Sequence, residues 1–140
     1  MANINSGGVV VGGLVAGLVI NISEYILNEP VLGAEMAAAM AAHNMPPIGG
    51  SAVALFLAYG FALGLALVWL YAAIRPRFGP GPKTAVVTGV AVWFLAYVTS
   101  MVFLGPMGVM SAQLIAIALI WGLVELVLAA LVGAWLYSEA

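Results

Sequence analysis

Long apolar runs separated by short polar breaks make up most of this chain. Because one crossing of a bilayer takes about 20 apolar residues, the runs predict four membrane-spanning helices, at 8–28, 51–74, 84–104 and 111–137. Both connections after the second helix are short, which favours antiparallel neighbours. The pattern therefore predicts an all-α protein, a four-transmembrane-helix bundle.

Proline and glycine predict where these helices end. Glu29-Pro30 closes the first run and Arg75-Pro76 closes the second, and we predict that the Gly-Pro-rich loop 75–83 is not helical. Between the first two spans, residues 34–42 are small helix-forming residues. Since nine residues are too few to cross the bilayer, we expect a short, outward-facing surface helix there.

The composition agrees with a location in the lipid bilayer. Of 140 residues, 66% are hydrophobic and 6% are charged, and four spans leave no room for a second domain. We therefore expect one integral membrane domain over 1–140. No Lys or Arg precedes the first run, which is also longer than a signal-peptide core, so we expect a retained helix.

All the basic residues lie in one connection. Arg75, Arg77 and Lys83 fall between the second and third spans, and positively charged loops remain on the cytoplasmic side. With four spans, both termini are then cytoplasmic, and we expect a multi-pass protein of the cell (inner) membrane.

The charges and the missing residue types exclude several functions. A net charge of −2 leaves no basic surface for nucleic acid. Without Cys there is no disulfide, Fe–S cluster or thiolate zinc site, and the single His has no Cys or Asp to work with. We therefore expect a protein that is not an enzyme and has no cofactor.

Small residues recur at helical spacing. The helix-packing candidates are Gly13, Gly17, Gly60, Gly64, Gly122 and Gly133. Small residues let helix backbones approach closely in a membrane. We expect the stripes on the first and fourth helices to be buried, with their small residues able to face each other.

Acidic and amide side chains continue two of these stripes. The candidate polar or ion site comprises Asn21, Glu24 and Asn28 on the first helix and Glu125 on the fourth. Acids in a span mark proton, ion or ligand paths, or they are protonated and hydrogen-bond to neighbours such as Asn21, Tyr59, Tyr97 or Gln113. At about 1.5 Å per residue, the backbones of Glu24 and Glu125 differ by roughly 14 Å in height. That difference argues against direct contact and against a carboxylate pair that shares one metal ion or proton, and it leaves a relay through water open.

A third pattern joins methionine and histidine. Met36, Met40 and His43 share one face of the expected short helix, and thioether and imidazole groups suit Cu(I). Methionine is also a flexible apolar filler, and we favour that interpretation.

Three segments carry a resemblance. Arg75-Pro-Arg-Phe-Gly-Pro-Gly-Pro-Lys-Thr-Ala, Trp121-Gly-Leu-Val-Glu125 and Gly133-Ala-Trp-Leu-Tyr137 resemble a group of small bacterial four-helix membrane proteins. The resemblance covers most of the chain and implies this fold and a bacterial membrane, with no particular activity.

Three functions follow as hypotheses. The first is a homo-oligomeric or accessory scaffold subunit of a larger membrane complex, held by lipid and by close-packed helices. The alternatives are a small transporter or channel that uses Glu24 and Glu125, and an outward-facing copper-binding protein. A cavity that reaches either acid favours transport, whereas dry contacts between helices favour the scaffold.

Overall fold

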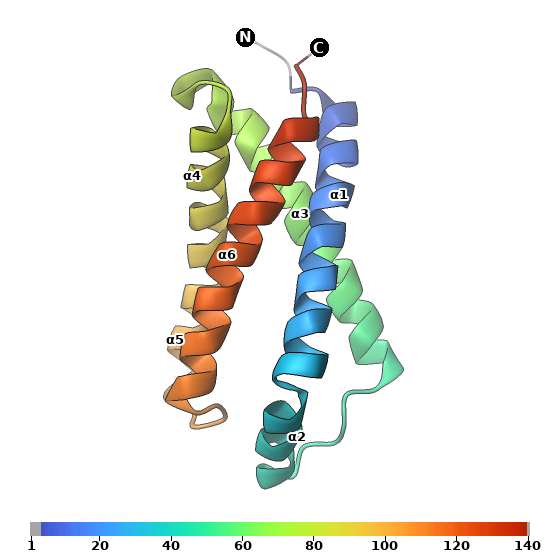
Figure 1. Ribbon diagram of the computed structural model, residues 1–140, viewed down its shortest axis with the longest axis vertical. Helices are drawn as coiled ribbons and strands as arrows, with labels where there is room; N and C mark the ends of the chain where they lie inside the picture. Colours follow the sequence, from blue (N-terminus) through green and yellow to red (C-terminus); the bar gives the residue numbers. More distant parts are fainter. Residues whose placement is uncertain (1–3, 140) are drawn as a thin grey trace.

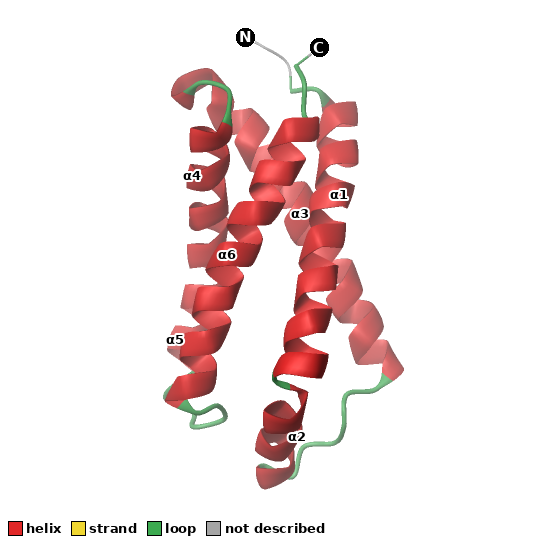
Figure 2. Ribbon diagram, in the orientation of Figure 1, coloured by secondary structure: helices red, strands yellow, loops and turns green. Residues whose placement is uncertain are grey.

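A computed structural model describes residues 4–139, and this part of the chain is a set of helices joined by short connections (Figures 1 and 2). In chain order the elements are α1 (Ser6–Ile26), the π-helical turn η1 (Leu27–Val31), α2 (Gly33–Ala42), α3 (Gly50–Phe78), α4 (Pro82–Trp93), the π-helical turn η2 (Phe94–Val98), α5 (Thr99–Leu104) and α6 (Ala112–Leu136). They form four long, apolar helical segments, each long enough to cross a membrane. The prediction of an all-α protein with four long apolar helices is confirmed.

The long helices associate as two pairs. α1 packs mainly on α3, α4 packs on α6, and contact between α1 and α6 joins the pairs (Figure 1). Fully buried side chains fill the junction, among them Ile20, Leu67 and Leu126. α2 projects beyond the lower end of α1 in Figure 1, and no residue of α2 is buried. Its position on a membrane surface stays a prediction.

The prediction that residues 75–83 form no helix was wrong at both ends of that segment. α3 continues to Phe78 with Pro76 inside it, and Pro82 is the first residue of α4. Pro76 lies in the last turn, so the helix loses the bond that an N–H at this position would give to the Ala72 carbonyl, and it ends two residues later. Pro82 stands at a position whose N–H would be unpaired in any helix. Only the short stretch between the two helices is a loop.

The first span also extends further than predicted. α1 passes into η1, which includes Pro30 and ends with a hydrogen bond of 2.8 Å from the Leu32 N–H to the Leu27 carbonyl. This bond spans five residues, so the backbone is wound more loosely than in an α-helix. The wider turn lets the helix pass Pro30, where the sequence pattern predicts its end.

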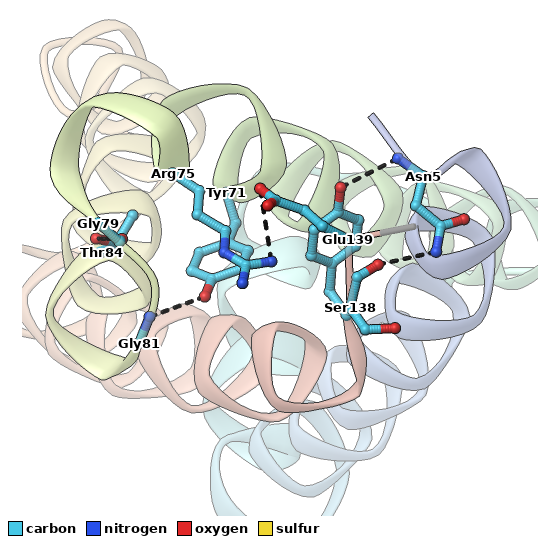
Figure 3. A network of polar contacts seen from close by, with 9 residues as sticks. Asn5, Tyr71, Arg75, Gly79, Gly81, Thr84, Ser138 and Glu139 are labelled. Atoms are coloured by element: carbon cyan, nitrogen blue, oxygen red, sulfur yellow. Dashed lines mark hydrogen bonds and ion pairs between the residues drawn. The ribbon is translucent and has the colours of Figure 1, made fainter. Parts of the chain in front are cut away.

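The two ends of the described chain meet at one end of the bundle, which we call the terminal end. The Asn5 backbone N–H donates to the Tyr137 hydroxyl at 3.1 Å, and the Asn5 side-chain amide donates to the Ser138 carbonyl at 2.8 Å (Figure 3). Both segments therefore lie on one side of any membrane that the four helices cross.

The loop between α3 and α4 lies at the same end. The Gly81 N–H donates to the Tyr71 hydroxyl at 3.0 Å (Figure 3). The Arg75 guanidinium pairs with Glu139 at 3.7 Å and lies 5.7 Å from the centre of the Tyr137 ring. The loop between α3 and α4 and the described ends of the chain therefore share the terminal end. The connection between α5 and α6 lies at the opposite end, beside α2 (Figure 1). We call that opposite end the α2 end.

Candidate functional site

One phenol hydroxyl joins the two acids of the spans. The Tyr97 hydroxyl lies 2.7 Å from Oε1 of Glu24 and 2.9 Å from Oε1 of Glu125. Glu24 comes from α1, Tyr97 from η2 and Glu125 from α6, so three helical segments meet here. We call these three residues the carboxyl–phenol chain. No hydrogen bond joins the two carboxyls directly within residues 4–139, as their backbone heights predict, but one hydroxyl reaches both.

The direction of the side chains explains the contact. In an α-helix, side chains lean toward the N-terminus of their own helix. α1 and α6 run in opposite directions (Figure 1), so Glu24 and Glu125 lean toward each other along the bundle. The Tyr97 ring fills the space that remains between them. A difference in backbone height is therefore no measure of the distance between two carboxyl groups on antiparallel helices.

The geometry fixes a minimum number of protons. A hydroxyl carries one proton and can donate it to one acceptor, while a carboxylate only accepts. Both contacts of Tyr97 are hydrogen bonds only if one carboxyl is protonated and donates to the phenol oxygen. Glu24 and Glu125 therefore hold at least one proton between them when both bonds are formed, and either carboxyl can carry it.

A glycine and a π-helical turn place the Tyr97 ring. A Cβ at Gly122 would lie 2.5 Å from the ring, so only glycine leaves room for the ring against α6. Tyr97 is in η2, and π-helical turns inside longer helices are frequent at functional sites. The sequence pattern predicts Tyr97 only as one of several hydrogen-bond partners of the acids. A glycine three residues before a buried acid was the available signal that a large side chain fits there.

The carboxyl–phenol chain continues to the surface at the α2 end. The Asn28 side-chain amide donates to Oε2 of Glu24 at 2.8 Å and to the Glu24 carbonyl at 2.9 Å. Asn28 is exposed and Glu24 is half-buried, whereas Glu125 is only 3% exposed. Polar contacts thus lead from the exposed amide to the buried acid. Asn21 takes no part, because its amide donates to the Leu57 carbonyl of α3 at 3.2 Å.

Beside Glu125, a groove of about 360 Å³ lies between α1 and α6. Five of its seven lining residues are apolar. The lining comprises Ser23, Ile117, Ile120, Trp121, Val124, Glu125 and Leu128. The Trp121 indole N–H donates to the Ser23 hydroxyl at 2.9 Å, which closes one side. Oε2 of Glu125 is buried and has no hydrogen-bond partner among residues 4–139.

The glycine candidates lie at helix contacts. A Cβ at Gly17 would lie 2.7 Å from the Phe61 Cα, and a Cβ at Gly64 would overlap the backbone of Gly13 and Gly17. Gly13, Gly17, Gly60 and Gly64 therefore belong to the contact of α1 with α3. The first and fourth helices also make the expected contact through small residues. On the first helix the residue in contact is Gly12, next to the predicted Gly13, and it lies against Gly133.

The methionine and histidine candidates lie apart from the carboxyl–phenol chain. Met36 packs against the apolar cluster of Leu27, Leu32 and Leu114, so its thioether is a packing group. His43 is exposed and ends α2. Within the described chain, no three His, Cys, Asp or Glu side chains are grouped to hold a metal ion.

Comparison with known proteins found no matching family model, no similar curated protein and no similar solved structure. The resemblance to small bacterial membrane proteins stays a prediction. Function is therefore inferred from the chemistry of the site itself.

Proposed function

We propose that this protein is an integral membrane protein that moves protons through the carboxyl–phenol chain, as a small transporter. The observation that carries the proposal is the Tyr97 hydroxyl within hydrogen-bond distance of both Glu24 and Glu125. A structural role for an acid needs one partner for each carboxyl. A hydroxyl shared between two acids provides, in addition, a route between them.

The transfer conserves charge and atoms. The O–H bond of a protonated Glu125 breaks as its proton binds the Tyr97 oxygen, and the original Tyr97 O–H bond breaks as that proton binds Oε1 of Glu24. Tyr97 stays neutral before and after, and the negative charge moves from Glu24 to Glu125. The reverse transfer uses the same two hydrogen bonds, so the route serves both directions.

One side of the route is open and the other is closed. Asn28 and Glu24 connect it to the α2 end, whereas Ile20, Leu126 and Ala129 lie on the terminal side of Glu125. The hydroxyls of Thr84 and Thr88 are also buried on that side, but they donate to backbone carbonyls and neither is hydrogen-bonded to Glu125. The full crossing therefore uses a second conformation or a second copy of the chain, which is the usual requirement for alternating access.

Tyr97→Phe tests the proposal. Phenylalanine keeps the ring against Gly122 and removes the hydroxyl, so the fold should remain and the proton route should be cut. In liposomes with an imposed pH gradient and a pH-sensitive dye inside, wild-type protein should dissipate the gradient at least tenfold faster than empty vesicles. The variant should match empty vesicles. Tyr25→Phe, which changes an exposed tyrosine of α1, is the control and should keep the wild-type rate.

The accessory or homo-oligomeric role is the second candidate. An exposed apolar face on the N-terminal half of α3 favours it. Residues Val53, Leu55, Phe56, Leu57 and Tyr59 are all exposed there, where α3 diverges from α6 (Figure 1). A second copy or another membrane protein covers such a face as well as lipid does. Gentle detergent extraction followed by mass measurement should give a multiple of the 14.4 kDa chain mass or a defined complex. A monomeric mass would contradict this candidate.

We propose that both termini are cytoplasmic in a bacterial inner membrane. Support comes from the basic residues Arg75, Arg77 and Lys83, which lie at or beside the terminal end. A reporter fused after the last residue should be active only as a cytoplasmic reporter. Activity of a reporter that works only outside the membrane would reverse the orientation, and the proton route would then open toward the cytoplasm.

A further inference from the structure

We propose that the groove beside Glu125 binds a lipophilic ammonium ion, whose N–H donates to Oε2 of Glu125 and whose apolar body lies along α6. This inference deepens the proposed transport function and rests on it for the role of Glu125. It assigns the transporter a substrate class, an amine with an apolar body that enters sideways from the lipid.

The polar anchor is a carboxyl oxygen with no partner. Oε1 of Glu125 contacts Tyr97, while Oε2 is buried without a hydrogen bond of standard geometry to any residue from 4 to 139. The Ser23 hydroxyl is the polar group beside this carboxyl in the groove lining, and it already accepts from Trp121. Buried polar atoms are nearly always paired, so one that lines a groove points to a donor supplied from elsewhere. The groove is where such a donor can approach.

The charge of the site selects a cation. Glu24 and Glu125 hold at least one proton between them when Tyr97 bonds to both, and with a single proton the pair carries one negative charge. All Lys and Arg residues of the chain lie at or near the terminal end, in or beside the 79–81 loop, so none neutralises this charge. A second proton or a bound cation must do so, because an unpaired charge in a membrane interior is costly.

The rest of the lining suits an apolar body. Five of the seven lining residues are Ile117, Ile120, Trp121, Val124 and Leu128. The volume of about 360 Å³ is in the range of small-molecule sites. The Trp121 ring adds attraction for a cation. Ile120 and Val124 are 68% and 55% exposed on the outer face of α6, so the groove opens toward lipid.

Competition follows from the shared carboxyl. The titratable groups facing Glu125 from packed elements are Glu24 of α1 and Tyr97 of η2. A proton added to the carboxyl–phenol chain removes the negative charge that the ammonium ion needs. We therefore expect ammonium binding to weaken as the pH falls, and binding at low pH to release protons.

Calorimetric titration in nanodiscs of zwitterionic phosphatidylcholine tests the inference, with empty nanodiscs as the background. The probes are 4-phenylbutylammonium and its neutral analogue 4-phenylbutanol. Wild-type protein should bind the ammonium ion saturably, with one site per chain. It should bind the alcohol at least tenfold more weakly.

Variants locate the site. Glu125→Gln should weaken ammonium binding at least tenfold. Val124→Trp, which fills the groove from an exposed position and leaves both acids in place, should do the same. The Val124→Trp variant keeps the test decisive if Glu125→Gln fails to fold. Glu35→Gln is the control, since Glu35 is an exposed acid of α2 outside the groove, and it should bind as wild type does.

Three results would overturn the inference: equal affinity for ammonium and alcohol, no saturable ammonium binding, or unchanged binding by Val124→Trp. Equal affinity would mean that the apolar body alone determines binding and that the Glu125 carboxyl takes no part. Binding is measured without a gradient, so it is independent of proton flux. A protein that moves protons but binds no ammonium has the proposed function with another substrate. If the wild-type protein binds ammonium but Tyr97→Phe leaves the proton flux unchanged, the protein lacks the proposed function.

Discussion

Gly17→Leu should destabilise the bundle by about 3 kcal/mol or prevent its assembly, because α1 and α3 touch through their backbones at this position. A Cβ at Gly17 would lie 2.7 Å from the Cα of Phe61 and 2.7 Å from its ring. The ring can turn away, but the Cα belongs to the α3 backbone and cannot. A leucine side chain therefore forces α1 and α3 apart.

The effect should extend to the carboxyl–phenol chain. Gly17 and Glu24 lie on the same helix, so moving α1 away from α3 also moves Glu24 relative to Tyr97. We expect a lower midpoint of thermal unfolding in detergent, followed by circular dichroism, and slower proton flux in whatever protein remains folded. The size of the added side chain is the cause in both measurements.

Gly50→Leu is the matched control. It makes the same substitution at the start of α3, where a Cβ meets no atom within 4 Å. Its unfolding midpoint should stay close to that of the wild type. Equal midpoints for Gly17→Leu and Gly50→Leu would mean that α1 and α3 do not pack through their glycines.

Apolar length and glycine spacing predicted most of the fold because each reflects one strong requirement. An apolar run of span length has few alternatives to a helix, and Gly13, Gly17, Gly60 and Gly64 have the spacing that close helix contacts need. Pro76 and Pro30 misled the prediction of helix ends, since the loss of one backbone hydrogen bond did not end either helix at once. Apolar length therefore predicted which segments are helical, whereas the positions of the prolines did not predict where the helices end.

The candidate site was only partly predictable, because its contacts depend on side-chain direction and on the register between helices. Glu24, Asn28 and Glu125 were identifiable as polar groups in apolar runs. Their connection through Tyr97 depends on the opposite directions of the side chains on two antiparallel helices, on the π-helical turn η2 and on the space at Gly122. None of these is visible in a count of residues from a helix end.

Replacing each acid of the carboxyl–phenol chain by Gln and by Leu should separate proton transfer from hydrogen bonding. Glutamine keeps the shape and the hydrogen-bonding capacity of glutamate but cannot release a proton, whereas leucine removes both. Glu125→Gln should therefore keep the wild-type unfolding midpoint. Glu125→Leu should cost about 1 kcal/mol, because a hydrogen bond between membrane helices is modest and Tyr97 retains Glu24 as a partner.

Proton flux should not follow stability, because glutamine and leucine both remove the proton that the acid transfers. Glu125→Gln, Glu125→Leu and Glu24→Gln should each reduce flux at least tenfold, to the rate of empty vesicles, even where stability is unchanged. The double variant Glu24→Gln with Glu125→Gln should lose no more than either single variant, because the acids act in one series and cutting it once is sufficient. Glu29→Gln changes an exposed acid of η1 and should keep the wild-type rate, which controls for the loss of charge near the α2 end. Wild-type flux in Glu125→Gln, together with a loss of stability in Glu125→Leu, would instead make Glu125 a structural hydrogen-bonding group, and the accessory role would then be the better account of this bundle.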